Sequence, residues 1–450
     1  MAKRNNRISK VVRQGPVIFG VLLFVFTSIL YLNIPEEPSY WQKYSDGWDY
    51  LSQSELPFFS SEFFFPSADD LTKFDARPFT IPLIFKLCGQ NVVAIIIVQK
   101  LLLALSALLL ALSLFLYVPK KWVKYLLVAS IFTLISWWNI LGWTKMLLSE
   151  SISISLLFTW LGSFIWYFKK PSYLRLSLHF VIMVLFSFTR DNWPYFLFLF
   201  YGMILLIAVL WNRKILKHTL LAFGLIITVF FIQQRSAYIG HRYQLPVMHN
   251  IVMKILPNDE YTEWFVARGM PCVDSLKTNF SNCTNENQKI YKLYRNPKYR
   301  EFLDWVNQEG RGTYTRFLIS HPARLFLINE PIKLRKEIFA HDLLYPGRPL
   351  GPGLWIKGLF PLFGGWFVVG LGLLCSLLFW KSKDMRFLLP PLLILLTTGN
   401  ALLLYNADAM EVSRHLFITR ILIELIGFIS ISLVLGSEYP KRLIQAFVKH

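Results

Sequence analysis

The stretch VVAIIIVQKLLLALSALLLALSLFLY, residues 92–117, decides the fold class. It is longer than the roughly 18 apolar residues that an α-helix needs to cross a hydrocarbon core about 30 Å thick. Its apolar residues are continuous and do not alternate with polar ones, which excludes a transmembrane β-barrel. Only 16% of the whole chain is charged, against about 25% in soluble globular domains. The sequence therefore predicts an all-α protein that crosses a membrane several times.

Further apolar segments flank this one, and together they predict about ten transmembrane helices. The expected spans are residues 16–34, 92–117, 122–141, 149–168, 174–189, 194–211, 216–233, 355–380, 386–405 and 416–436. The first span follows a basic tail, as the apolar part of a signal peptide would. It lacks a small-residue cleavage site, so we interpret it as a helix that is retained.

Lysine and arginine in the short loops indicate how these helices are oriented. The tail before the first span carries five bases and no acid, and every even-numbered span ends at a basic loop or tail. Such residues mark the cytoplasmic side of a membrane. We therefore predict a multi-pass protein of the cell membrane with cytoplasmic N- and C-termini. Because these segments hold almost all of the formal net charge of +20, the charge is a topogenic signal, and no nucleic-acid partner is expected.

The segments on the opposite, extracytoplasmic side are longer. Residues 35–91 form an outer loop, and residues 234–354 are too long and too polar for a connector, so we expect a small, mainly helical outer domain there. The predicted organisation is a transmembrane module over 1–233, the outer domain over 234–354, and a module of three helices over 355–450. Cys272 and Cys283 fall in the outer domain, where an oxidising environment would allow a disulfide.

Charged residues gather where these helices are expected to end on the outer side. Ionisable groups near membrane depth are costly and usually functional. Five separate segments supply both signs there, whereas scattered snorkelling would supply mainly lysine and arginine. The residues are Asp46, Asp49, Asp75, Arg77, Lys145, Glu150, Arg190, Asp191, Asp408, Glu411, Arg414 and His415. This distribution predicts one binding crevice that combines carboxylates with cations.

Several of these residues also suit ordinary structural roles. Asp46 and Tyr50 are four residues apart and would share a helical face, which suits a general base at a cleft. Asp46 would equally cap a short helix. Glu150 would fit the first turn of any helix, and Arg190 would form an ion pair with Asp191 next to it. Both interpretations stay open for each of these positions.

The segment from Asp408 to His415 points most directly to a ligand. Asp408, Glu411 and His415 fall on one helical face, with Arg414 beside them. Arginine and histidine both donate charge-assisted hydrogen bonds, which suits a phosphate group. Arg77 would bind a phosphate or a lipid headgroup, or simply anchor the chain at the interface. The outer carboxylates are able to hold Mg²⁺ or Mn²⁺, but their spacing matches no metal motif, so no metal site and no certain cofactor are predicted.

These features resemble the C-type (GT-C) integral-membrane glycosyltransferases. The stretch from Asp46 to Tyr50, in a long first outer loop, is similar to the Asp-Glu-x-x-Tyr motif of bacterial aminoarabinose transferases and protein mannosyltransferases. An Arg-Pro step and an apolar stretch follow in the same loop, and seven spans precede a large outer segment, as in the seven-helix module of the family. The triplet 190–192 and the segment 411–415 are similar to those of uncharacterised bacterial members. Two departures are Gly47, in place of the usual second acid, and an outer domain that lies between spans seven and eight.

The resemblance implies an inverting transfer of a sugar from a polyprenyl phosphate to a glycan, lipid or protein acceptor at the extracytoplasmic face. Asp46 would be the general base. The donor phosphate would be bound by Arg190, Arg414 and His415, with Arg77 and Lys145 in second rank. The residues that would orient these cations or hold substrate are Asp49, Tyr50, Glu150, Asp191, Asp408 and Glu411. Because the donor is a lipid, membrane lipids are expected partners as well.

Two other functions remain open from the sequence. A lipid-linked glycan polymerase or ligase would place its key arginine and histidine residues in a large late outer loop, here 234–354. A flippase or transporter would carry charges at the bilayer midplane and broken helices in paired halves. Mid-span charges are scarce in this chain, Lys100 and Glu424 being the main ones.

Overall fold

The computed structural model describes an all-α protein. The described residues are 2–33, 45–66, 76–169, 171–211, 213–280, 293, 296–322, 329–339, 362–407, 409 and 412–438, and no strand occurs among them. Within these ranges, eight helices are long and apolar enough to cross a membrane. They are α1 (Ala2–Leu32), α5 (Val92–Leu114), α8 (Ser149–Lys169), α10 (Trp193–Trp211), α11 (Leu216–Ile239), α20 (Gly365–Ser382), α21 (Leu389–Ala407) and α22 (Val412–Gly436). The protein is therefore a multi-pass membrane protein.

Two of the ten expected spans are shorter helices. Both α6 (Lys121–Ile135) and α9 (Tyr173–Ser187) have 15 residues. At 1.5 Å per residue each is about 22 Å long, less than a hydrocarbon core of about 30 Å. α6 stops where the chain turns into the short helix α7 (Trp138–Trp143), and both α6 and α9 pack against longer helices of the bundle. Length and composition thus support eight spans, and α6 and α9 are two further, shorter helices.

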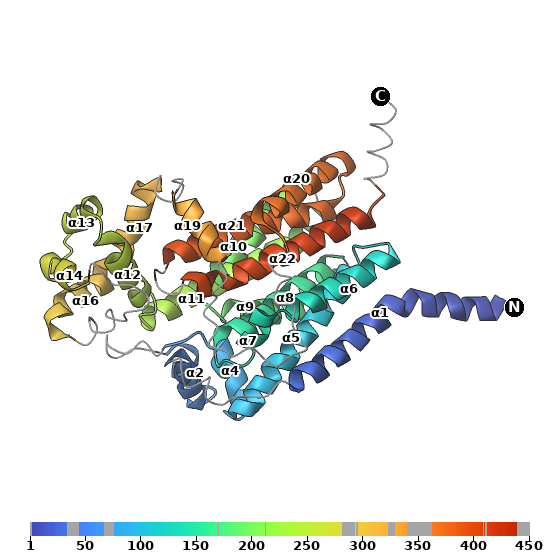
Figure 1. Ribbon diagram of the computed structural model, residues 1–450, viewed down its shortest axis with the longest axis horizontal. Helices are drawn as coiled ribbons and strands as arrows, with labels where there is room; N and C mark the ends of the chain where they lie inside the picture. Colours follow the sequence, from blue (N-terminus) through green and yellow to red (C-terminus); the bar gives the residue numbers. More distant parts are fainter. Residues whose placement is uncertain are drawn as a thin grey trace.

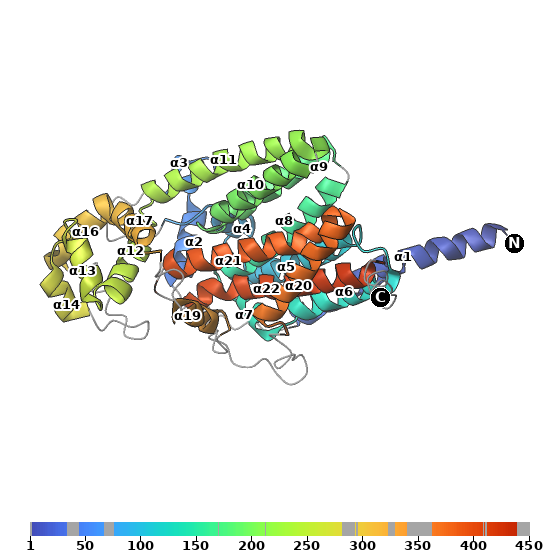
Figure 2. The ribbon, with the colours of Figure 1, turned by 90° about the horizontal axis from the view of Figure 1, so that it is seen from above.

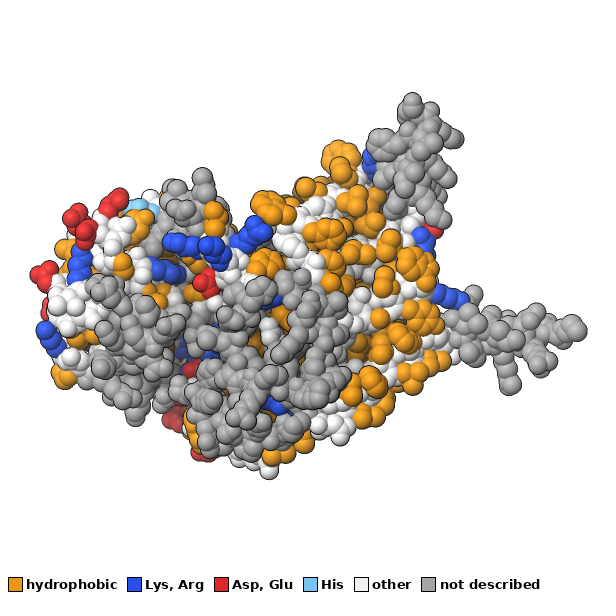
Figure 3. All heavy atoms as spheres, in the orientation of Figure 1, with side chains coloured by type: hydrophobic (Ala, Val, Ile, Leu, Met, Phe, Trp, Pro, Cys, Tyr) orange, Lys and Arg blue, Asp and Glu red, His pale blue; other side chains and the backbone are white. Residues whose placement is uncertain are grey.

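One continuous apolar core holds the bundle together. α8 and α22 are buried along most of their length, whereas α1, α11 and α20 turn apolar side chains outward. Apolar side chains form a band over the face of the bundle that Figure 3 shows, as expected for a surface that faces lipid. α8 lies so close to α5 that a Cβ at Gly162 would be 3.2 Å from the Cα atom of Leu110. A glycine at this position allows that close approach.

The basic loops that were predicted to share one side of the membrane meet at one end of the bundle. Lys120 donates to the carbonyls of Leu435 and Ser437, at 2.8 and 3.0 Å. Arg386 donates to the carbonyl of Tyr117 at 2.7 Å, and the Lys169 ammonium lies 5.4 Å from the Tyr117 ring. The N-terminus extends from this same end, and the outer domain lies at the opposite end (Figures 1 and 2). That the basic end faces the cytoplasm stays a prediction from the charges.

The segment between α11 and α20 contains a small helical unit with its own apolar core. Its helices are α12 (Gln244–Asn250), α13 (Asp259–Val266), α14 (Val273–Phe280), α16 (Arg300–Trp305) and α17 (Arg311–Ser320), with π-helical turns at Ile251–Ile255 and Val306–Gly310. A further helix, α19 (Asn329–Ile338), packs against α21 and α22. The expected disulfide lies outside the described residues, because they do not include Cys283.

The outer domain caps the last turn of α21. The final carbonyls of a helix have no partner within the helix. Here Lys254 donates to the carbonyl of Tyr405 at 2.5 Å, the Tyr314 hydroxyl donates to that of Asn406 at 2.9 Å, and Asn250 donates to that of Ala407 at 2.8 Å. The lysine charge also suits the negative end of the helix dipole. The outer domain therefore fixes the end of α21, from which the chain turns back into α22.

Candidate functional site

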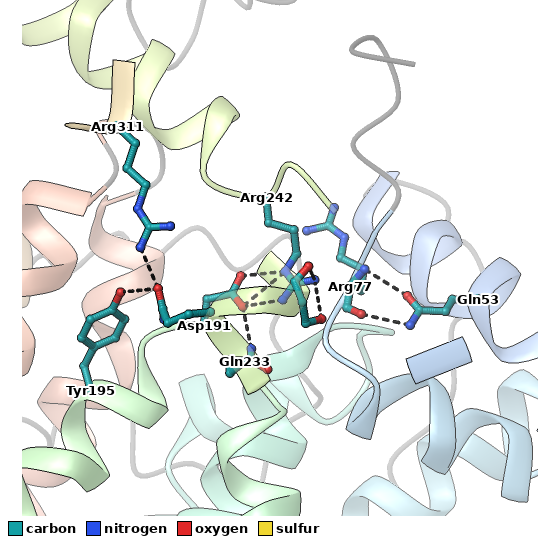
Figure 4. Close-up of polar contacts among 9 residues, drawn as sticks. Gln53, Arg77, Asp191, Tyr195, Gln233, Arg242 and Arg311 are labelled. Atoms are coloured by element: carbon teal, nitrogen blue, oxygen red, sulfur yellow. Dashed lines mark hydrogen bonds and ion pairs between the residues drawn. The ribbon is translucent and has the colours of Figure 1, made fainter. Parts of the chain in front are cut away.

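A short helix of the first outer loop presents one polar face. α2 (Ser45–Glu55) places Asp46, Asp49, Tyr50 and Gln53 at helical spacings of three and four residues. Tyr50 is buried against α4 (Thr80–Leu87) and α5, in a small apolar cluster. Gln53 holds the backbone of Arg77 through two hydrogen bonds, at 3.0 Å to its amide and 2.9 Å to its carbonyl (Figure 4). The helix and the Arg-Pro step are thereby joined.

The side chain of Arg77 reaches back to the acids of α2. Its terminal nitrogen lies 2.8 Å from Asp46 Oδ1 and 2.5 Å from Asp49 Oδ2. Its Nε donates to the same Asp49 oxygen at 3.1 Å. Arg77 was predicted to bind a ligand or to anchor the interface, and in the free protein it pairs with these two carboxylates.

The second half of the site joins α8 to α22. Glu150, in the first turn of α8, is fully buried, and its Oε1 accepts from Arg414 Nε at 2.7 Å. Arg190 lies 3.9 Å from the same oxygen and 2.7 Å from His415 Nδ1. Arg414 also contacts Asp46 Oδ2 at 3.3 Å, which connects this half to α2.

These contacts form a single charge cluster. It consists of Asp46, Asp49, Arg77, Glu150, Arg190, Arg414 and His415. The sequence predicted that these residues lie at one level, and the structure brings them together from the first loop, α8, the loop before α10 and the start of α22. Three carboxylates face three guanidinium groups, which offsets the cost of taking these charges out of water.

One atom of the cluster has a hydrogen-bonding capacity that the described residues do not use. Glu150 Oε2 is buried and has no hydrogen-bond partner among them. A buried carboxylate oxygen without a donor is uncommon and costly. The atom is therefore suited to accept a hydrogen bond from a hydroxyl or amine of a ligand.

Two opposing effects set the pKa of Asp46. Burial raises the pKa of its carboxyl, but the guanidinium groups of Arg77 and Arg414 lower it more, so that it falls well below its usual range. In Tyr50, burial outweighs the effect of Arg77 and raises the pKa, so the phenol stays protonated. Asp46 is therefore an ionised ion-pair partner and a weak base.

This lowered pKa predicts a particular dependence of stability on pH. The ionised form of Asp46 stabilises the fold at every pH above its unfolded-state pKa, about 3.9. That contribution is lost as the pH falls below this value, through the lower pKa of the folded state. We expect the unfolding temperatures of the wild type and of Asp46→Asn, measured in detergent from pH 7 down to pH 3, to differ most at neutral pH, and the difference to begin to narrow as the pH falls below about 4. A difference that stayed constant over this range would contradict the prediction.

Asp191 does not join the charge cluster. It accepts a hydrogen bond from Gln233 at 2.6 Å and pairs with Arg242 at 3.0 Å, so the ion pair with its neighbour Arg190 considered in the sequence is replaced by other partners (Figure 4). Beside it, Tyr195 and Arg311 both donate to Gln234, at 2.8 and 2.6 Å. We call this group, Asp191, Tyr195, Gln233, Gln234, Arg242 and Arg311, the junction network. It ties α10 and α11 to the outer domain.

Sequence reasoning missed Arg242 and Gln53. Neither lies in a motif, and Arg242 falls just beyond the predicted span 216–233. A weak signal was available in Gly240, where an added Cβ would be 2.8 Å from the Cβ of Ala76. Gly240 follows the observed end of α11, beyond the predicted span, and its lack of a side chain allows the close approach of the 240–242 turn to the segment that begins with Ala76 and Arg77.

Lys145 and three acids complete the predicted set of residues. Lys145 is buried in the turn between α7 and α8. Asp75, Asp408 and Glu411 lie outside the described residues, so the structure gives no account of their roles. Over the described ranges, no group of three or more His, Cys, Asp or Glu side chains is placed to hold a metal ion.

Comparisons with protein-family models, curated proteins and solved structures gave no match for this chain. The class that the structure itself supports is a polytopic, all-helical membrane protein with a partly buried charge cluster at one end of its bundle. The resemblance to GT-C glycosyltransferases therefore remains a hypothesis, which rests on the sequence features and on the geometry of this cluster.

Proposed function

We propose that this protein is a GT-C type glycosyltransferase that moves a sugar from a polyprenyl phosphate to an acceptor at the extracytoplasmic membrane face. The observation that carries the proposal is the contact between Asp46 of the first outer loop and Arg414 of the last helix, within a cluster that also holds Glu150 and Arg190. Charged groups at this depth are costly and usually functional. This reaction needs a base and several cations that can bind a phosphate, and the cluster contains residues of both kinds.

The cations of the cluster suit a departing phosphate. In the reaction, an acceptor hydroxyl or amine attacks the anomeric carbon from the face opposite the phosphate. The bond between that carbon and the phosphate oxygen breaks, its electron pair leaves with the oxygen, and the acceptor proton passes to Asp46. Arg190, Arg414 and His415 would stabilise the negative charge that develops on the phosphate, with Arg77 next to them.

Donor binding would turn Asp46 into a better base. In the free protein Arg77 and Arg414 depress the pKa of its carboxyl. A phosphate that binds Arg414 would take part of that cation's interaction away from Asp46, and the pKa would rise towards its ordinary value. The catalytic base would therefore become active only when the donor is in place. Glu150 Oε2 and Asp49 would accept hydrogen bonds from sugar hydroxyls.

The proposal can be tested with the purified full chain in lipid nanodiscs. The assay would follow the conversion of labelled polyprenyl-phosphate sugars to polyprenyl phosphate, with and without a chelator for Mg²⁺ and Mn²⁺. We expect turnover with at least one donor, and a loss of about 10²-fold in Arg190→Gln, because the substitution removes one donor to the leaving phosphate. The control Arg268→Gln changes an exposed arginine of the outer domain and should keep full activity.

Two results would count against the proposal. Equal turnover of the wild type and Arg190→Gln would exclude the cluster as the phosphate site. Dependence of the activity on Arg268 or His321 of the outer domain, with Arg190 replaceable, would favour the polymerase or ligase alternative.

A further inference from the structure

α19 is an amphipathic helix whose apolar side is already used inside the protein. Leu334 and Ile338 are buried and pack with Ala401 of α21 and with Val412 and Leu416 of α22. These contacts place α19 beside the outer-domain end of the bundle, at the level of the charge cluster. Because this packing fixes the rotation of the helix, its opposite side must face outward.

The outward side of α19 carries cations. Lys333, Arg335 and Lys336 are exposed, and Ile332 beside them is 48% exposed. The helix contains two acids, Glu330 at its start and Glu337, and the latter accepts a hydrogen bond from Ser413 at 2.5 Å. Glu337 thus contacts α22, and the three cations are exposed at the surface.

The position of these cations relative to the apolar band is informative. Figure 3 shows lysine and arginine side chains gathered over α17 and α19, where the apolar band of the bundle meets the outer domain. When the band lies in the hydrocarbon core, this boundary lies at the depth of the phospholipid phosphates. Positive residues near the cytoplasmic ends of helices set the topology, but the orientation predicted from the loops puts α19 on the other side. Topogenesis therefore does not account for its charge.

We propose that α19 binds the headgroups of anionic phospholipids in the outer leaflet. Three exposed cations and one exposed isoleucine beside the apolar band match a surface of phosphates above acyl chains. The hydrogen bond between Glu337 and Ser413 places this contact next to Arg414, so a bound headgroup would also help to fix the start of α22. The proposal is independent of the proposed sugar transfer, since lipid binding can be measured without it.

The test compares two triple variants of the full-length protein. In Lys333→Gln/Arg335→Gln/Lys336→Gln the cations of α19 are removed. The matched control, Arg268→Gln/Lys298→Gln/Arg300→Gln, removes three exposed cations of the outer domain away from the apolar band. Binding of phosphatidylglycerol and of phosphatidylcholine to each protein in detergent is measured by native mass spectrometry. Because each cation near a membrane surface contributes about fivefold to binding, we expect phosphatidylglycerol affinity to fall at least tenfold in the α19 variant and less than twofold in the control.

Further measurements separate lipid binding from other causes. Arg335→Lys, which keeps the charge, should keep the affinity, and added salt should weaken phosphatidylglycerol binding in the wild type only to the level of the α19 variant. Thermal unfolding in detergent without added lipid should be the same for both triple variants. Equal phosphatidylglycerol affinity in the wild type and the α19 variant would overturn the proposal. So would displacement of the lipid by millimolar inorganic phosphate, which would indicate a site for free anions.

Discussion

Glu150→Gln is expected to destabilise the folded protein by about 3–5 kcal/mol. The carboxylate is fully buried and is the partner of Arg414 at 2.7 Å and of Arg190 at 3.9 Å. Glutamine has almost the same shape but carries no charge, so both guanidinium groups would lose a buried counter-ion. Removing one member of a buried ion pair costs much more than the pair contributes, because the remaining charge stays out of water.

The measurement is the unfolding temperature in detergent at neutral pH. Glu62→Gln is a suitable control because that side chain is exposed on α3 (Ser61–Phe64), and it should change stability little. The double variant Glu150→Gln/Arg414→Gln should recover part of the loss, since it removes one of the two uncompensated cations. If Glu150→Gln unfolded at the wild-type temperature, the carboxyl group would not be ionised in the cluster.

Asp46→Asn is expected to lower sugar transfer by about 10²–10⁴-fold, the usual contribution of a general base. Its effect on stability should be much smaller than that of Glu150→Gln. Arg77 keeps Asp49 as a partner at 2.5 Å, and Arg414 keeps Glu150. The two substitutions therefore separate the roles of the two carboxylates, one in the reaction and one in the fold.

The comparison is made on one preparation by turnover with a polyprenyl-phosphate sugar and by thermal unfolding. Asp49→Asn is the matched control, because Asp49 lies on the same helix as Asp46 and shares Arg77 with it. We expect it to keep more activity than Asp46→Asn. Turnover near the wild-type rate in Asp46→Asn would remove Asp46 as the base, and a normal rate in both variants would leave α2 without a catalytic role.

The long apolar runs predicted the fold class well because a membrane helix is defined by its own sequence. Helix ends were predicted less well. α11 was expected to end at residue 233, but it continues to Ile239 because its polar last turns are covered by the outer domain. α6 was expected to reach residue 141, but it ends at Ile135, before the separate helix α7. Contacts with other parts of the chain decided both boundaries, and a local pattern does not contain them.

The candidate site, too, was predicted only in part from the sequence. The sequence predicted that Asp46, Glu150, Arg190 and Arg414 lie at one level, because the topology puts the span ends next to them on the same side of the membrane. Their pairing did not follow, because it depends on how the helices rotate and pack. Asp191 shows this most clearly, since it is adjacent to Arg190 in sequence but pairs with Arg242.

The distance along the chain between Asp46 and Arg414 has a consequence for biosynthesis. The ribosome makes the acidic helix of the first loop, and later Glu150, long before it makes the guanidinium group that joins them. Until α22 enters the bilayer, Glu150 lacks its closest counter-ion, Arg414. The turn that connects α21 to α22 has not yet formed either. An abbreviated product that stops before residue 412 would therefore keep unbalanced carboxylates at the membrane surface, and cellular proteases should recognise it as incomplete.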